Sequence, residues 1–184
     1  GTPITYDMPG NSIYRGQSRA AGSDFEIAFI VPKDISYNTR SGRISGYFTD
    51  GESDGAGVMT QIPVAGSANI TDENGPAIEL SFDGTGSFFS GDMLSIPARL
   101  TAVLEDDKTG INIAGDIGHN ITLSIDDGAP VSLTDYFQYD QGSYLKGRLE
   151  YPLDDLDEGE HILSFKAWDN ANNSNEQNLL VEAV

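Results

Sequence analysis

Apolar and polar residues alternate along most of the chain in short runs, which is the pattern of strands buried on one face. The clearest run is His161–Trp168, in which Leu163, Phe165 and Ala167 share one face. The Asn- and Asp-rich residues 169–175 then end the strand, because these side chains bond to their own backbone. This is how a strand of a β-sandwich ends.

Strands of this kind fall into two groups along the chain. The first group lies in residues 1–71 and contains three predicted strands: Phe25–Val31, Arg43–Thr49 and Val58–Val64. The second group is longer, and its strands are Ile78–Phe82, Ala98–Leu104, Asn120–Ile125, Val131–Leu133, Tyr144–Tyr151, His161–Trp168 and Leu179–Ala183. Turn residues such as Asp126-Asp127-Gly128 separate them.

This pattern predicts an all-β protein made of immunoglobulin-like β-sandwich modules. We expect two modules, residues 1–71 and residues 72–184, joined at the Gly- and Asn-containing stretch 66–76. The first module has too few strands for two packed sheets. It is either a small sheet that leans on the second module or, as we expect, a module that is incomplete at its N-terminus. Because the chain begins with Gly1 rather than Met, we expect it to be a piece of a longer protein.

The charge balance excludes several partners. The chain has 184 residues with 10 Lys and Arg against 29 Asp and Glu, a net charge of −19. Phosphates of nucleic acids and anionic lipids would be repelled, and the acidity suits an extracytoplasmic protein. No apolar run approaches the ~18 residues that span a bilayer. The absence of cysteine removes disulfides, thiolate metal sites and any cysteine nucleophile.

Calcium is the one ligand that the sequence favours. Loops between strands bring distant carboxylates and amides together, and Ca²⁺ prefers several oxygen ligands. The candidate ligands, all at strand ends or module junctions, are Asp72, Asp106, Asp107, Asn112 and Asp169. The alternative is that these residues form ordinary Asx turns.

Nothing in the sequence predicts a catalytic residue or another cofactor site. His119 and His161 are the two histidines, and they lack the short spacing typical of a metal pair. No serine lies in a G-x-S-x-G elbow, and no phosphate-binding glycine motif is present.

Aromatic residues suggest an alternative function. Trp168 lies on the strand face opposite Phe165, where it would contact the rest of a parent protein or a ligand. A carbohydrate-binding or adhesin-type module would use Trp168 with surface tyrosines such as Tyr136, Tyr139 and Tyr144 as stacking platforms.

Several sequence blocks, taken together, resemble a known family. They are FIVPKDISYN (29–38), DENGPAIELSF (72–82), TGINIAGDIGHNITLSID (109–126) and GEHILSFKAWDNANNSNE (159–176). The series resembles the region C-terminal to the peptidase domain in PorU-like sortases of the type IX secretion system, a gingipain-like cysteine peptidase family of Bacteroidetes.

The resemblance implies a role within a larger enzyme. That family removes the secretion signal of cargo proteins and helps to attach them to the cell surface, using a Cys-His pair that this cysteine-free chain cannot supply. The implied function is therefore a non-catalytic scaffold or interaction region of an outer-membrane or cell-surface peptidase. Implied partners are the remainder of that peptidase and outer-membrane secretion components. An unpaired strand edge would also permit an edge-strand dimer of the fragment.

Overall fold

A computed structural model describes residues 10–33, 35, 41–64, 69–83, 88–115 and 118–184. The chain forms two compact units: Gly1–Asp34 together with Thr71–Val184, and Ile35–Ile70. None of the described residues forms an α-helix. Each unit is described by itself.

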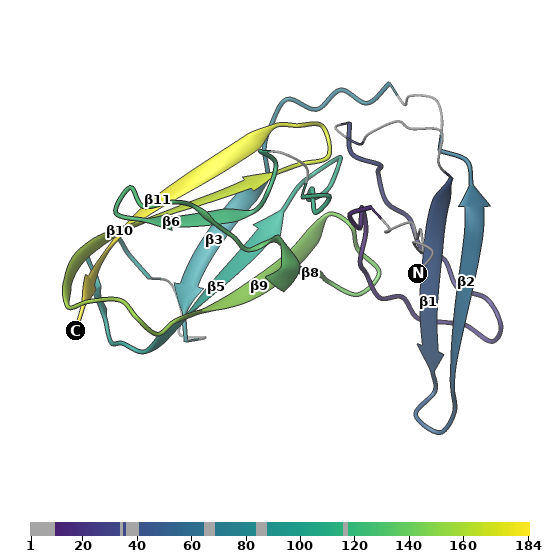
Figure 1. Cartoon of the computed structure of the whole chain (residues 1–184), viewed down its shortest axis with the longest axis horizontal. Helices are drawn as coiled ribbons and strands as arrows, with labels where there is room; N and C mark the ends of the chain where they lie inside the picture. Colours follow the sequence, from purple (N-terminus) through teal and green to yellow (C-terminus); the bar gives the residue numbers. More distant parts are fainter. Residues whose placement is uncertain (1–9, 34, 36–40, 65–68, 84–87, 116–117) are drawn as a thin grey trace, which may run out of the picture. The chain divides into compact units, whose positions relative to one another are not determined.

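The larger unit is a sandwich of two sheets (Figure 1). The five-stranded sheet has the order β4 (Met93–Leu94), β11 (Ser174–Ala183), β10 (Gly159–Trp168), β6 (Thr122–Ile125) and β7 (Val131–Ser132). The four-stranded sheet has the order β3 (Ala77–Phe82), β5 (Ala98–Glu105), β9 (Lys146–Leu153) and β8 (Gln138–Tyr139). A 3₁₀ turn, η1 (Thr134–Tyr136), precedes β8.

This strand order is that of an immunoglobulin-like domain. The sheet β3-β5-β9-β8 corresponds to strands A, B, E and D, and β6, β10 and β11 correspond to C, F and G. The short strand β4 pairs parallel with β11, whereas the other pairs are antiparallel. The predicted all-β, immunoglobulin-like sandwich is confirmed.

The core lies between the central strands β5 and β10. Leu100 and Leu104 of β5, and Leu163 and Phe165 of β10, are fully buried. They occupy alternate positions, so each strand turns one apolar face inward, as the sequence pattern predicted.

The ladder between β10 and β11 extends beyond the apolar pattern. The two strands pair over ten residues each, from Gly159↔Ala183 to Trp168↔Ser174. The sequence predicted the last strand only from Leu179, because residues 174–178 are all polar. Those residues are in a strand because β10 provides backbone partners for them, which a hydrophobicity pattern does not reveal.

The prediction of a strand at Phe25–Val31 is wrong. The segment forms no strand in the described structure, and Phe25 and Ile27 are exposed by 51% and 41%. It belongs to the larger unit through Phe29, whose ring stacks on Tyr14 at a centroid distance of 4.9 Å. Tyr14 in turn stacks on Tyr139 at 5.1 Å. An alternating sequence forms a strand only where a neighbouring strand accepts its backbone hydrogen bonds.

The smaller unit is a two-stranded hairpin, β1 (Gly42–Thr49) and β2 (Asp54–Ile62). Its turn is closed by Asp50, whose Oδ1 accepts hydrogen bonds from the backbone N–H groups of Glu52 and Ser53 at 2.9 and 2.7 Å. The strand predicted from Val58 therefore begins earlier, at Asp54, which pairs with Thr49.

The exchange of a core side chain tests the sandwich. We expect Phe165→Ala to lower the free energy of unfolding by about 3–5 kcal/mol, because it removes a fully buried ring and leaves a cavity. The matched control is Ile162→Ala on the outward face of the same strand, where half of the side chain is exposed. Its cost should stay near about 1 kcal/mol. Equal losses in urea denaturation would contradict the assignment of the buried face.

Candidate functional site

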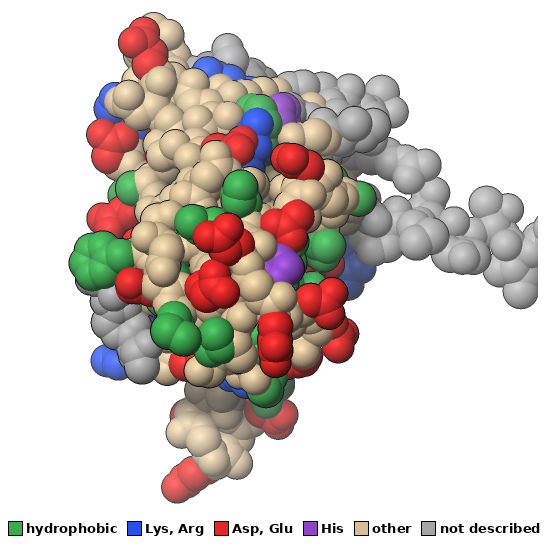
Figure 2. Space-filling model, turned by 90° about the vertical axis from the view of Figure 1, so that its left-hand side faces the viewer, with side chains coloured by type: hydrophobic (Ala, Val, Ile, Leu, Met, Phe, Trp, Pro, Cys, Tyr) green, Lys and Arg blue, Asp and Glu red, His purple; other side chains and the backbone are tan. Residues whose placement is uncertain are grey.

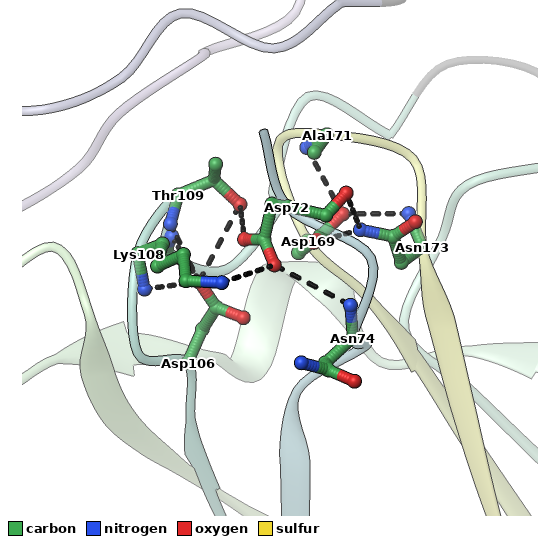
Figure 3. A network of polar contacts seen from close by, with 9 residues as sticks. Asp72, Asn74, Asp106, Lys108, Thr109, Asp169, Ala171 and Asn173 are labelled. Atoms are coloured by element: carbon green, nitrogen blue, oxygen red, sulfur yellow. Dashed lines mark hydrogen bonds and ion pairs between the residues drawn. The ribbon is translucent and has the colours of Figure 1, made fainter. Parts of the chain in front are cut away.

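Three segments that are far apart in the sequence meet at one end of the sandwich (Figure 3). They are the segment before β3, the long β5–β6 loop and the β10–β11 loop, and each supplies one buried aspartate. Asp72, Asp106 and Asp169 are exposed by 7%, 4% and 0%. Buried carboxylates are costly unless hydrogen bonds or cations compensate them, so their partners decide what this end of the molecule can do.

Asp106 organises the β5–β6 loop. Its Oδ2 accepts hydrogen bonds from the backbone N–H groups of Thr109 and Gly110, both at 2.7 Å, and of Lys108 at 3.1 Å. Gly110 has φ +82°, and a Cβ there would lie 2.3 Å from the carbonyl oxygen of Tyr144. Only glycine fits this position, and the loop is therefore held in one shape.

Asp169 organises the β10–β11 loop in the same way. Its Oδ1 accepts hydrogen bonds from the backbone N–H groups of Ala171 at 2.9 Å and Asn173 at 2.7 Å, and its Oδ2 accepts one from Asn173 Nδ2 at 2.8 Å. Burial raises the pKa of Asp169, and the nearby carboxylates of Asp106 and Asp72 raise it further.

Asp72 links the two loops. Its Oδ2 accepts a hydrogen bond from Thr109 Oγ1 at 2.9 Å, and its Oδ1 lies 3.9 Å from the ammonium nitrogen of Lys108. Its backbone carbonyl accepts a hydrogen bond from Asn173 Nδ2 at 3.0 Å. Asn173 therefore contacts both Asp169 and the segment that leads into β3.

Three of the five predicted calcium ligands are brought together. Asp72, Asp106 and Asp107 each offer a carboxylate oxygen within 4.8 Å of the others. Asp169 lies close enough for its charge to interact with Asp72 and Asp106. Asn112 is buried in the same loop, but its Oδ1 accepts a hydrogen bond from the backbone N–H of Ala114 at 2.9 Å.

An open pocket of about 160 Å³ lies beside these carboxylates. It is lined by Asn74, Gly75, Ala77, Glu105, Asp106 and Asp107. Chemically, the arrangement offers partly desolvated carboxylate oxygens next to solvent, which suits a hard cation better than it suits an acid–base reaction. Whether calcium binds there stays a prediction.

Sequence reasoning missed the residues that satisfy the buried carboxylates, namely Thr109, Lys108 and Asn173. The contacts of Asp106 with its own loop carried a signal, because an aspartate at a strand end, followed two residues on by a free backbone N–H, is typical of an Asx turn. The hydrogen bond from Asn173 to Asp72 joins residues about a hundred positions apart, and no local sequence pattern predicts it.

The two histidines do not form a pair. The ring of His119 lies 4.4 Å from that of Trp168, at the C-terminal end of β10, whereas His161 lies near its start. Seven residues of strand separate the two ends, about 23 Å.

His161 has its own partners. Its Nδ1 lies 2.5 Å from Asp126 Oδ2, and its Nε2 lies 2.8 Å from the carbonyl oxygen of Asp157. Both partners are acceptors, so only the imidazolium form donates to both. The hydrogen bond to Asp126 raises the pKa of His161, and the bond to Asp157 adds to the effect.

The aromatic residues predicted to form a carbohydrate-binding surface differ in how exposed they are. Trp168 is half-buried and is contacted by His119 and by the ammonium of Lys166, 4.8 Å from the ring centroid. Tyr139 is buried, which corrects its prediction as a surface tyrosine, and it donates a hydrogen bond to the carbonyl oxygen of Ile111. Tyr144 is half-buried, and Tyr136 is 48% exposed. A sugar platform would therefore rest mainly on Tyr136.

Comparison with known proteins relates this chain to a solved structure. No protein-family model matches the chain, and no curated protein sequence does. Among solved structures, the chain is similar to the crystal structure of dimeric latent PorU from Porphyromonas gingivalis, with 31% identical residues and a TM-score of 0.58. The match covers 87% of this chain and 15% of the PorU chain.

Fold and comparison together define an immunoglobulin-like sandwich that is similar in sequence and structure to one part of PorU. This supports the predicted PorU-like relationship. The chain has no cysteine and so does not carry the nucleophile of a cysteine peptidase. None of the described residues forms a helix long and apolar enough to cross a membrane.

His161 makes the stability of the sandwich depend on pH. Its folded-state pKa is raised, so the stabilisation from its contacts with Asp126 and Asp157 is fully present below the unfolded pKa of about 6.5. It is lost as pH rises through the folded pKa. Urea unfolding measured from acidic to alkaline pH should therefore show a decline above about pH 6.5 that His161→Gln removes. The same decline in the variant would contradict this assignment.

Proposed function

We propose that this chain is a non-catalytic, immunoglobulin-like scaffold and interaction region of a larger gingipain-like peptidase of the PorU type. The observation that carries the proposal is the 31% identity to PorU over 87% of this chain. The sandwich suits such a role because its apolar side chains are used for packing two sheets, and its end loops are held by buried hydrogen bonds. In this role the region supports secretion of cargo proteins and their attachment to the cell surface.

The hairpin unit supports the idea of an incomplete first module within residues 1–71. Ile44, Phe48 and Met59 occupy one face of the hairpin and are exposed by 50%, 43% and 63%. A two-stranded hairpin is marginal by itself in water, and an apolar face needs a second layer. The remainder of the parent protein is the occupant that we propose for this face, since the match covers 15% of PorU.

The proposed location and partners follow from the parent. The region would act outside the cytoplasm, at the outer membrane or cell surface, where the remainder of the peptidase and outer-membrane secretion components are its partners. A net charge of −19 is compatible with such a soluble, exposed region. The competing occupant of the hairpin is a second copy of the chain that pairs through a strand edge, and the PorU crystal structure is itself dimeric.

Binding between the two parts of the parent protein tests the proposal. The remainder of the peptidase, expressed separately, should bind this chain in isothermal titration calorimetry. Replacing Ile44, Phe48 and Met59 together by serine should weaken binding at least about tenfold, because each buried apolar side chain contributes about 1.5–3 kcal/mol. The control replaces Val131, an exposed valine of the short strand β7, by serine and should leave binding unchanged.

Two results would overturn the proposal. One is the absence of binding by the unmodified chain. The other is a concentration-dependent dimer in sedimentation velocity that the triple serine variant abolishes, because a second copy would then cover the hairpin.

We also propose that Asp72, Asp106 and Asp107 bind Ca²⁺, with Asp169 adding to the negative potential. This network holds three buried carboxylates, one of which, Asp72, lies near the ammonium of Lys108, and the exposed Asp107 borders the open pocket. A bound divalent cation would compensate the excess negative charge of a poorly solvated site. The ordinary Asx-turn interpretation remains the competing one, since backbone N–H groups already satisfy one oxygen of Asp106.

Calcium should raise the midpoint of thermal unfolding, because a ligand that binds only the folded state stabilises it, by about 2.7 kcal/mol at a hundredfold excess over Kd. Asp107→Asn should remove this shift with little effect on stability in chelator, since Asp107 is exposed. The control Asp127→Asn, in an exposed turn at the other end of the sandwich, should retain the shift. A midpoint that neither calcium nor chelator moves would favour simple Asx turns.

A further inference from the structure

The outward face of the five-stranded sheet carries an exposed apolar group near the end of β11. Phe89 and Met93 are each 69% exposed, and Ile162 is 50% exposed. Ile162 lies directly opposite Leu180 in the ladder, and the backbone N–H of Gly91 donates to the carbonyl oxygen of Leu180 at 2.8 Å. These contacts place residues 89–93 beside β11. Met93 pairs with Glu182 and its buried neighbour Leu94 pairs with Ala183, so Met93 lies on the same outward face as Ile162.

Acidic side chains border this apolar group. Figure 2 views the molecule from the side on which the C-terminus lies in Figure 1 and shows hydrophobic side chains standing among acidic ones, with few basic side chains. Glu160 and Glu182 lie directly opposite each other on β10 and β11, and Met93 is the next residue across, on β4. Such directly opposed side chains have Cβ atoms about 4.5–5.5 Å apart.

Like charges on directly opposed side chains of a sheet are destabilising. Within the described part of the chain, neither Glu160 nor Glu182 forms an ion pair. Further along the same face the pairing is of opposite sign, because Lys166 lies opposite Glu176. The two strands thus place opposite charges across from each other at one position and like charges across from each other beside the apolar group. Unfavourable local arrangements of this kind are concentrated at functional surfaces.

We propose that this face is a docking surface for a partner protein segment that carries a lysine or arginine flanked by apolar side chains. The basic group would lie between Glu160 and Glu182 and relieve their repulsion, while the flanking side chains would cover Met93, Ile162 and Leu180. Charge complementarity selects this occupant. A second copy of the chain in a symmetric contact would bring the same acidic pair against itself, and a polyanion would be repelled.

Peptide binding to the full chain tests the proposal. The probe is a fluorescein-labelled peptide of about ten residues, with one central lysine and leucine or valine at alternating positions in a serine and threonine background. Fluorescence anisotropy should show saturable binding of this peptide. Binding should be lost in a peptide with glutamate in place of the central lysine, and also in a peptide with serine at the apolar positions. Glu160→Gln, Glu182→Gln and Met93→Ser should each weaken binding about fivefold.

The matched control is Glu176→Gln, which makes the same charge change on the same face but at a position opposite Lys166. It should leave peptide binding unchanged. If it weakened binding as much as Glu160→Gln and Glu182→Gln do, the effect would come from the overall charge of the chain, and the proposal would be overturned. Absence of binding by the unmodified chain would also overturn it. So would self-association that Met93→Ser abolishes, because the occupant would then be a second copy.

A second measurement is independent of the peptide. If Glu160 and Glu182 repel each other, Glu182→Gln should raise the midpoint of thermal unfolding, whereas Glu176→Gln should lower it or leave it unchanged. A lower midpoint for Glu182→Gln would show that the pair is not repulsive and would remove the electrostatic basis of the proposal.

Discussion

The larger unit depends on the burial of alternating apolar side chains between two sheets. Leu100 and Leu104 of β5 and Leu163 and Phe165 of β10 are removed from water, and each such burial contributes about 1.5–3 kcal/mol. Because the inward positions supply the packing, the outward positions and the loops carry the polar and charged residues that distinguish this sandwich from others. Its functional properties therefore belong to surfaces placed on a rigid body.

The loop network around Asp106 and Asp169 is the second constraint. Each carboxylate receives several backbone N–H groups of its own loop, and Asp72 and Asn173 connect the two loops. Buried groups satisfied in this way stabilise one loop conformation and make its alternatives costly. The same network concentrates negative charge, so it links the shape of this end of the sandwich to the charges that approach it.

The hairpin unit contrasts with the sandwich because it has one layer. Its Ile44, Phe48 and Met59 have the same alternation as the buried residues of β5, but they are exposed. The chain therefore holds one buried core, in the sandwich, and one hairpin whose apolar side chains are exposed.

The sequence alone determined the fold class, the alternation of β10 and the identity of most carboxylates at the loop end. These depend on local periodicity and turn chemistry, which a linear pattern records. It failed at Phe25–Val31, which alternates but forms no strand, and at Ser174–Asn178, which is polar but pairs with β10. Only the tertiary structure decided which segments found backbone partners and which aspartates met across the loops. Those outcomes depend on contacts between distant residues, whose free energy no short window of sequence contains.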